Sequence, residues 1–317
     1  METSPVHTLT LTGVLSESKR IIRSNYTHFL TLSLFFLPIS VYLIINPTLH
    51  IADHHHFTAD RHPQYNQKTA INHLIYVLTV SILALTATAT ITFSTHHGFF
   101  NNPIDFLTAI KSLIVSFIPL VATVIVANTL LFLMLFTYLM LIGLGVMLLQ
   151  TLGFVSVIDY NSIYFMLFSA LVGLGLFAIV LYYHVNWSLA FVVVVVESKW
   201  GFSPLMRSAY LVKGMRSVSL SLLLFYGVLG GLLVYVYSRS LLTYGVTGWG
   251  VFFTVFGSMF LMMLLLQSTT ANTVLYNYCK ALHGELAIEV GEGFGYEYDN
   301  LAADDEKAPR IVTVVAP

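Results

Sequence analysis

The segment Glu197–Gly214, with the sequence ESKWGFSPLMRSAYLVKG, is a polar island between two strongly apolar regions, and it contains its own helix start and stop signals. Ser203 can accept a hydrogen bond from a free backbone N–H, and Pro204 suits the first helical position because its missing N–H would be unpaired there. Gly214 can adopt the left-handed conformation at which many helices end. These signals predict a short helix between Ser203 and Gly214.

The predicted island helix is amphipathic and is flanked by aromatic and basic side chains. Leu205, Ala209 and Val212 share one face, whereas Arg207 points the other way. Such a helix typically lies in the membrane–water interface, with its basic side toward lipid headgroups. The residues predicted to contact headgroups are Lys199, Trp200, Arg207, Lys213 and Arg216. The alternative interpretation is a basic loop that only sets the topology.

The composition identifies the class of protein. Hydrophobic residues make up 57% of the chain and charged residues 9%, and the mean hydropathy is +0.81. Soluble domains contain about 25% charged residues, so the sequence predicts a polytopic integral membrane protein. The near-balance of 14 basic and 15 acidic residues favours no nucleic-acid partner, and the single cysteine excludes an internal disulfide.

The hydrophobic pattern predicts an all-α bundle of six transmembrane helices, with eight as the alternative. We expect a cytoplasmic amphipathic N-terminus over residues 1–28, a polytopic membrane domain over 29–283 and a disordered acidic cytoplasmic tail over 284–317. Within the first part, residues 9–24 form a second predicted interfacial helix. Its apolar face consists of Leu11, Val14, Leu15, Ser18, Ile21 and Ile22.

The predicted spans differ in length. The two outermost pairs are conventional and cover 29–45, 74–95, 217–238 and 250–278. Pro47 is expected to end the first span, and a histidine-rich polar loop and a turn at 96–103 are expected on either side of the second. Residues 112–152 and 163–196 contain no charged side chain and exceed the roughly 20 residues that one crossing needs. Each of these two runs is either one long helix or a hairpin of two spans.

The basic residues predict the sidedness. With six spans, eleven lysine and arginine residues fall on one side of the membrane and three on the other. Cytoplasmic loops are enriched in these residues, so we expect both termini in the cytoplasm. The expected location is the endomembrane system or the plasma membrane.

The spans contain no motif that indicates catalysis. They lack Asp, Glu, Lys and Arg, which usually mark proton relays and ion pathways in membranes. We therefore predict a protein that is not an enzyme, with no catalytic residue, no cofactor and no bound metal. The histidines of the first loop are interpreted as a solvated loop rather than a metal site.

A polar intramembrane site is the sharpest candidate within the spans. It consists of Asn128, His184 and Asn186, which either line a solute path or lie near a boundary and bond to a neighbouring backbone. Four side chains are predicted to form hydrogen bonds between helices: Asn128, Gln267, Asn272 and Asn277. Glycines are expected to mark the packed centre of the bundle, namely Gly143, Gly145, Gly173, Gly175, Gly227, Gly230 and Gly231.

Two features near the C-terminus suggest partners or modification. Tyr298 and Leu301 fit the tyrosine-x-x-hydrophobic pattern of a sorting signal, which would bind a cytoplasmic adaptor. Cys279 lies at the end of the last span, where palmitoylation is conceivable and burial is the preferred interpretation.

Several segments carry a resemblance to a family of uncharacterised plant multi-span membrane proteins. They are VLSESKRII at 14–22, HGFF at 97–100 with the following Pro103, and ESKWGFSP and LVKG within the island. More distantly, the layout is similar to the membrane domain attached to glycerophosphoryl diester phosphodiesterases. The resemblance implies a six-helix membrane domain and no catalytic residue.

The functional hypothesis is a non-enzymatic integral membrane protein that organises membrane lipids or partners at the cytoplasmic face. The alternative is a transporter or channel for a neutral or lipid-like solute, which would need no buried charge. The oligomeric state does not follow from the sequence.

Overall fold

A computed structural model describes residues 10–56, 63–100, 104, 106–151, 163–245 and 247–285, which form helices and contain no strand. The first half of the chain comprises α1 (Leu11–Ser24), α2 (Tyr26–Ser33), the 3-10 turn η1 (Leu34–Phe36), α3 (Leu37–His56), α4 (Pro63–Phe99) and α5 (Phe106–Thr151). The second half comprises α6 (Ile163–Asn186), α7 (Ala190–Glu197), α8 (Ser203–Leu211), the 3-10 turn η3 (Val212–Gly214), α9 (Arg216–Tyr244) and α10 (Gly248–Leu282).

The fold is that of an all-α integral membrane protein. Within the described residues, six helical segments are long and apolar enough to cross a bilayer: Tyr26–Thr48, Ile71–Phe99, Phe106–Leu148, Ile163–Glu197, Arg216–Tyr244 and Gly248–Leu282. The prediction of six spans is confirmed. α5 is one uninterrupted helix, and α7 packs against α4 and α5, so neither long run folds into the hairpin that eight spans would require.

Two predicted helix ends are wrong. Pro47 lies inside α3, which continues to His56, and His96 and His97 belong to the last turn of α4 instead of a loop. A proline that interrupts a helix in water can be tolerated within a membrane helix, because lipid offers the backbone no alternative hydrogen-bonding partner. Sequence signals for helix ends in soluble proteins therefore place these boundaries too early.

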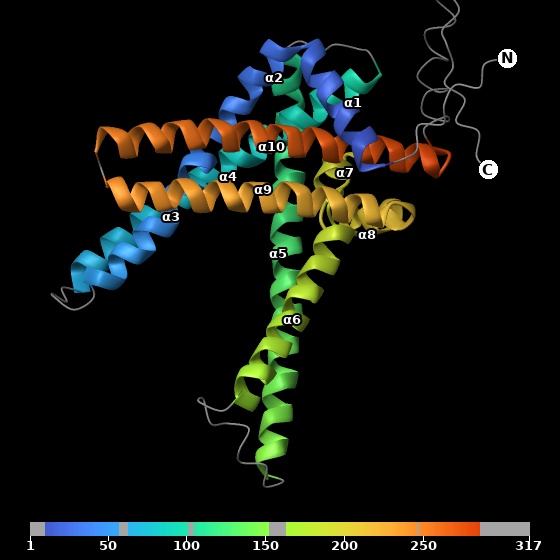
Figure 1. Cartoon of the computed structure of the whole chain (residues 1–317). Helices are drawn as coiled ribbons and strands as arrows, with labels where there is room; N and C mark the ends of the chain where they lie inside the picture. Colours follow the sequence, from blue (N-terminus) through green and yellow to red (C-terminus); the bar gives the residue numbers. More distant parts are fainter. Residues whose placement is uncertain are drawn as a thin grey trace, which may run out of the picture.

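The spans do not form one parallel bundle (Figure 1). α3 packs against α9 and α10, and α4 packs against α10, whereas the α5–α6 pair, which contacts α4 through α5, projects away from this group. The six spans converge on a region that we call the hub, which consists of α1, α2, α7 and α8 with the adjoining ends of α4 and α10. α10 is the central element, since it contacts α1, α3, α4, α7, α8 and α9.

Most of the predicted glycine contacts are absent from this arrangement. A Cβ added at Gly143, Gly145, Gly173, Gly227 or Gly231 would meet no atom within 4 Å, so the expectation that these residues mark tight packing is wrong. Two of the predicted glycines, Gly175 and Gly230, do lie at close contacts, and Gly230 faces Leu264 of α10. Gly257, which was not predicted, lies at a further one. A Cβ at Gly175 would overlap the Tyr138 hydroxyl between α5 and α6, and one at Gly257 would overlap the Tyr237 ring between α9 and α10.

α1 forms as predicted, but its apolar face packs against protein. Val14, Ile21 and Ile22 are buried in the main hydrophobic core, and Ser18 beside them is 2% exposed. This face lies against α10, α4 and α9, and not in the lipid interface where we expected it. Burial of large aliphatic side chains stabilises by about 1.5–3 kcal/mol each, so α1 holds the hub together.

The chain breaks between α6 and α7, directly after the sequence HVNW at 184–187. Ser208 of α8 satisfies the backbone there: its hydroxyl donates to the Asn186 carbonyl (2.7 Å) and accepts from the Leu189 N–H (3.2 Å). The Ser208 side chain is fully buried. The island helix therefore fills the gap that the broken span leaves.

Replacing Gly257 with alanine tests the contact between α9 and α10. Because the Tyr237 ring occupies the space that the methyl group needs, we expect a loss of about 1–3 kcal/mol of stability. Thermal unfolding of the detergent-solubilised protein measures the effect. Gly143→Ala is the matched control, since its added methyl group meets open space. Equal unfolding temperatures for the two variants would contradict the packing.

Candidate functional site

The island segment Glu197–Gly214 forms a turn followed by α8 and η3. Ser198 (φ 52°) and Gly201 (φ 72°) adopt left-handed conformations that reverse the chain after α7. The helix begins one residue earlier than expected. Phe202 is the N-cap, and Ser203 does not provide the predicted capping bond. Gly214 also differs, because it has no left-handed backbone and is instead needed where Leu282 packs against it.

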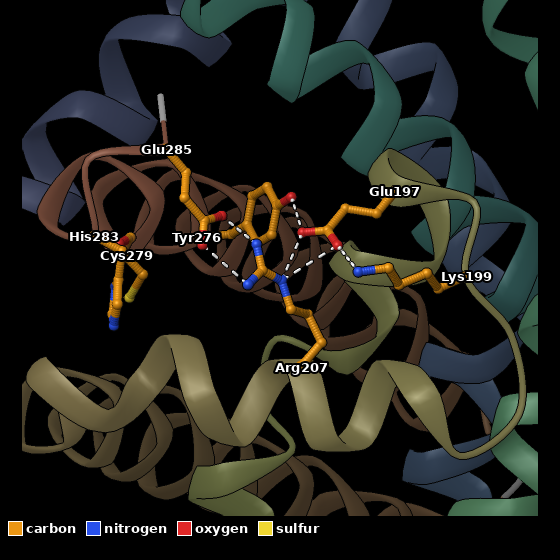
Figure 2. A network of polar contacts seen from close by, with 7 residues as sticks. All are labelled: Glu197, Lys199, Arg207, Tyr276, Cys279, His283 and Glu285. Atoms are coloured by element: carbon orange, nitrogen blue, oxygen red, sulfur yellow. Dashed lines mark hydrogen bonds and ion pairs between the residues drawn. The ribbon is translucent and has the colours of Figure 1, made fainter. Parts of the chain in front are cut away.

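The Glu197 carboxylate is the centre of a polar network between the island and α10 (Figure 2). It accepts hydrogen bonds from Lys199 Nζ (2.8 Å), the Tyr276 hydroxyl (2.9 Å) and Arg207 Nε (3.2 Å). The side chain of Glu197 is only 12% exposed, so these donors replace the water that it loses. Tyr276 is fully buried in the core, which links the network to the last span.

Arg207 joins this centre to the end of the chain that the structure describes. Its guanidinium lies between Glu197 and Glu285 in Figure 2, and it binds both carboxylate oxygens of Glu285, with Nη1 to Oε1 at 3.0 Å. The bonds to Glu285 and the nearby charge of Glu197 raise the pKa of Arg207 above its already high ordinary value. Arg207 also lies over the ring of Tyr210 at 5.6 Å. α8, α7 and the end of α10 are thereby connected.

The five predicted headgroup residues fall into two groups. Lys199 and Arg207 are bound in the network, so Arg207 does not point freely outward as its helical position suggested. Trp200 is 68% exposed, and Lys213 and Arg216 are exposed without an acidic partner among the described residues. Of the five, only these last three have side chains that take no part in the network.

The predicted polar intramembrane site is divided as well. Asn128 of α5 and His184 of α6 line a cavity of about 720 Å³, together with residues of α9 and α10. Asn186 lies outside it, buried at the α6–α7 break, where its side-chain amide donates to the Tyr182 carbonyl in its own helix. The two alternatives for this residue were a place in a solute path and a hydrogen bond to a neighbouring backbone. Asn186 forms a backbone hydrogen bond, but within α6.

Of the four side chains predicted to form hydrogen bonds between helices, one does so in the described structure. Asn277 Oδ1 pairs with His96 Nδ1 at 2.9 Å and joins α10 to α4, which confirms that prediction. Asn128 donates to Val124 in its own helix. Gln267 and Asn272 form no side-chain hydrogen bond with another residue in the described part of the chain. Cys279 is fully buried, as preferred, and Tyr298 and Leu301 lie outside the described residues.

Sequence reasoning did not single out Glu197, Ser208, Tyr276 or Glu285. One signal for Glu197 was present, because it is the only acidic residue in a segment with four nearby basic residues. Tyr276 is 79 residues from Glu197 and Glu285 is 78 residues from Arg207, so no local pattern could pair them.

The fold and the hub define an all-α integral membrane protein with a polar, ion-paired junction at the ends of its spans. The family described as Domain of unknown function (DUF8558) matches residues 1–290, and the chain belongs to this family. No curated protein and no solved structure matches the chain.

Replacing Arg207 with methionine tests the network. It leaves Glu285 without its partner and Glu197 with one donor fewer, so we expect a loss of about 1–3 kcal/mol of stability, measured by thermal unfolding. Arg207→Lys should restore little, because an ammonium group cannot bind two carboxylates through a planar fork. Arg216→Met is the control and should change stability by less than about 0.5 kcal/mol. An unfolding temperature for Arg207→Met equal to that control would rule out a stabilising network.

Proposed function

We propose that this protein is a non-enzymatic component of the endomembrane system or plasma membrane that organises lipids at the cytoplasmic face, using α8 and its flanking residues as an interfacial surface. The observation that carries the proposal is a set of exposed aromatic and apolar side chains outside the spans. Trp200 is 68% exposed, Phe202 52%, Met206 61% and Tyr210 52%.

The spacing of these side chains gives α8 a second, outward face. Phe202, Met206 and Tyr210 recur every four residues, so they lie above one another on the side opposite the buried Leu205 and Ser208. Exposed aromatic groups beside unpaired basic groups are typical of surfaces that insert into the headgroup region. Lys213 and Arg216 supply those basic groups.

The position of the hub supports the predicted threading. Each of the six spans has one end at the hub, which alternating passage through a bilayer would produce. Eleven of the fourteen basic residues lie in the segments assigned to the hub side. We therefore propose that the hub and both termini are cytoplasmic, and that Tyr298 and Leu301 present a sorting signal to an adaptor there.

Charge reversal at Lys213 and Arg216 tests the lipid interaction without disturbing the ion-paired network. The full-length protein is reconstituted in vesicles that contain a spin-labelled phosphatidylserine, and the motionally restricted fraction is measured by electron paramagnetic resonance. We expect Lys213→Glu with Arg216→Glu to lower the restricted anionic fraction by about fivefold, at roughly 1 kcal/mol for each basic residue near the surface and with some screening by salt.

Lys111→Glu with Lys19→Glu is the matched control. It reverses two lysines on the same predicted side of the membrane, outside the island. An equal loss in the control, or no loss in the island variant, would remove the proposed role of this surface.

The cavity favours a second candidate, transport of a neutral or lipid-like solute. Its location among α5, α6, α9 and α10 and its lining by Asn128 and His184 are the supporting observations. The test is transbilayer movement of an uncharged fluorescent lipid analogue in proteoliposomes. We expect faster movement than in protein-free vesicles and a loss of most of this gain with His184→Leu, but not with Gln267→Leu, which lies outside the cavity. Movement at the protein-free rate would exclude transport of this lipid.

A further inference from the structure

Glycines of α9 form part of the cavity wall. Gly227 and Gly231 line it, and an added Cβ at either position would meet no atom within 4 Å. The opposite walls are Leu131 of α5, Val180 of α6 and Leu264 of α10. Its volume, about 720 Å³, lies in the range of roughly 300–1,000 Å³ that small-molecule sites occupy.

Several polar side chains without partners converge on this apolar space from separate helices. His184 of α6 and Ser268 and Asn272 of α10 line the cavity, and none forms a side-chain hydrogen bond with another described residue. Asn128 of α5 uses only its amide N–H₂, on its own backbone. In a hydrocarbon environment each unpaired polar group costs several kcal/mol, so this set indicates a hydrogen-bonding occupant.

The electrostatics limit the chemistry of that occupant. The lining contains no Asp, Glu, Lys or Arg, so a charged headgroup would be desolvated without a counter-charge. Asn272 and Asn128 offer amide oxygens as acceptors, and Ser268 offers a hydroxyl that can donate or accept. An uncharged group that both donates and accepts, such as a hydroxyl, can donate to one of these amide oxygens and accept from Ser268.

The surroundings indicate where the occupant comes from. The lining of the cavity includes residues of α5 and α6. This helix pair projects from the rest of the fold (Figure 1) and exposes apolar side chains along its length. We infer that this cavity binds a membrane lipid with an uncharged hydroxyl-bearing headgroup, whose hydroxyl meets the polar side chains and whose chain lies along Gly227 and Gly231. The inference deepens the second candidate function and rests on the same cavity, although binding does not require transport.

A matched pair of photoreactive lipids tests the class of ligand. The full-length protein is reconstituted with a diazirine-bearing diacylglycerol or with the phosphatidic acid that carries the same chains, and covalent labelling is mapped by mass spectrometry. We expect diacylglycerol to label residues of α6, α9 and α10 around the cavity at least about fivefold more than phosphatidic acid. Equal labelling by both lipids at these residues would overturn the assignment of an uncharged headgroup.

Variants that fill the cavity test whether the lipid binds there. Gly227→Leu with Gly231→Leu occupies the space without a backbone clash, and we expect it to lower diacylglycerol labelling at least about fivefold. Gly143→Leu is the matched control, because it adds the same side chain at a glycine with open space on α5, outside the cavity. Undiminished labelling in the double variant would overturn the site.

A second test of the site does not depend on the glycines. It compares Asn272→Leu with the control Gln267→Leu. Loss of one hydrogen bond of about 1 kcal/mol should lower labelling about fivefold for Asn272→Leu and leave Gln267→Leu unchanged. Labelling that persists while no lipid moves across the bilayer would exclude transport and retain the binding site. Equal labelling of the two variants would overturn the role of the polar side chains.

Discussion

The absence of water in the bilayer interior forces every backbone and polar group in the spans to find a partner within the protein. This constraint explains why α5 is a single long helix without a break, and why the break between α6 and α7 is filled. Between α6 and α7, Ser208 donates to one exposed carbonyl and accepts from one exposed N–H. The island helix is therefore part of the structure of the fourth span, although it begins after that span has ended.

The charged side chains at the hub are likewise paired within the protein. Glu197 lies at the very end of its span with little exposure, and it accepts bonds from two basic side chains and one tyrosine. Arg207 extends the pairing to Glu285 after α10. Exposed ion pairs contribute little, but this one is partly buried and bidentate, so it can hold α7, α8 and α10 in a defined relation. Of the basic residues in and beside the island, Lys213 of η3 and Arg216 of α9 have no acidic partner among the described residues.

Glycine serves two opposite purposes in this fold. At Gly257 the missing side chain lets α10 approach Tyr237 of α9, whereas at Gly227 and Gly231 it leaves a cavity beside the same helix pair. The sequence does not distinguish these two roles, because a glycine in an apolar run indicates only that a side chain is missing. Whether a neighbour fills the space depends on the angle at which the helices cross, and the α5–α6 pair points away from α9 and α10 instead of lying parallel to them (Figure 1).

The sequence by itself determined the class, the six spans, the helix at the N-terminus and the island helix. These follow from local quantities: apolar length, charge, amphipathic period and the proline and glycine at the ends of a segment. The tertiary structure alone decided that the apolar face of α1 is buried in the hub, that Arg207 binds Glu197 and Glu285, and that Asn272 faces a cavity instead of a neighbouring helix. Each of these depends on which distant helix lies opposite a given face, and a periodic pattern specifies the face without specifying what covers it.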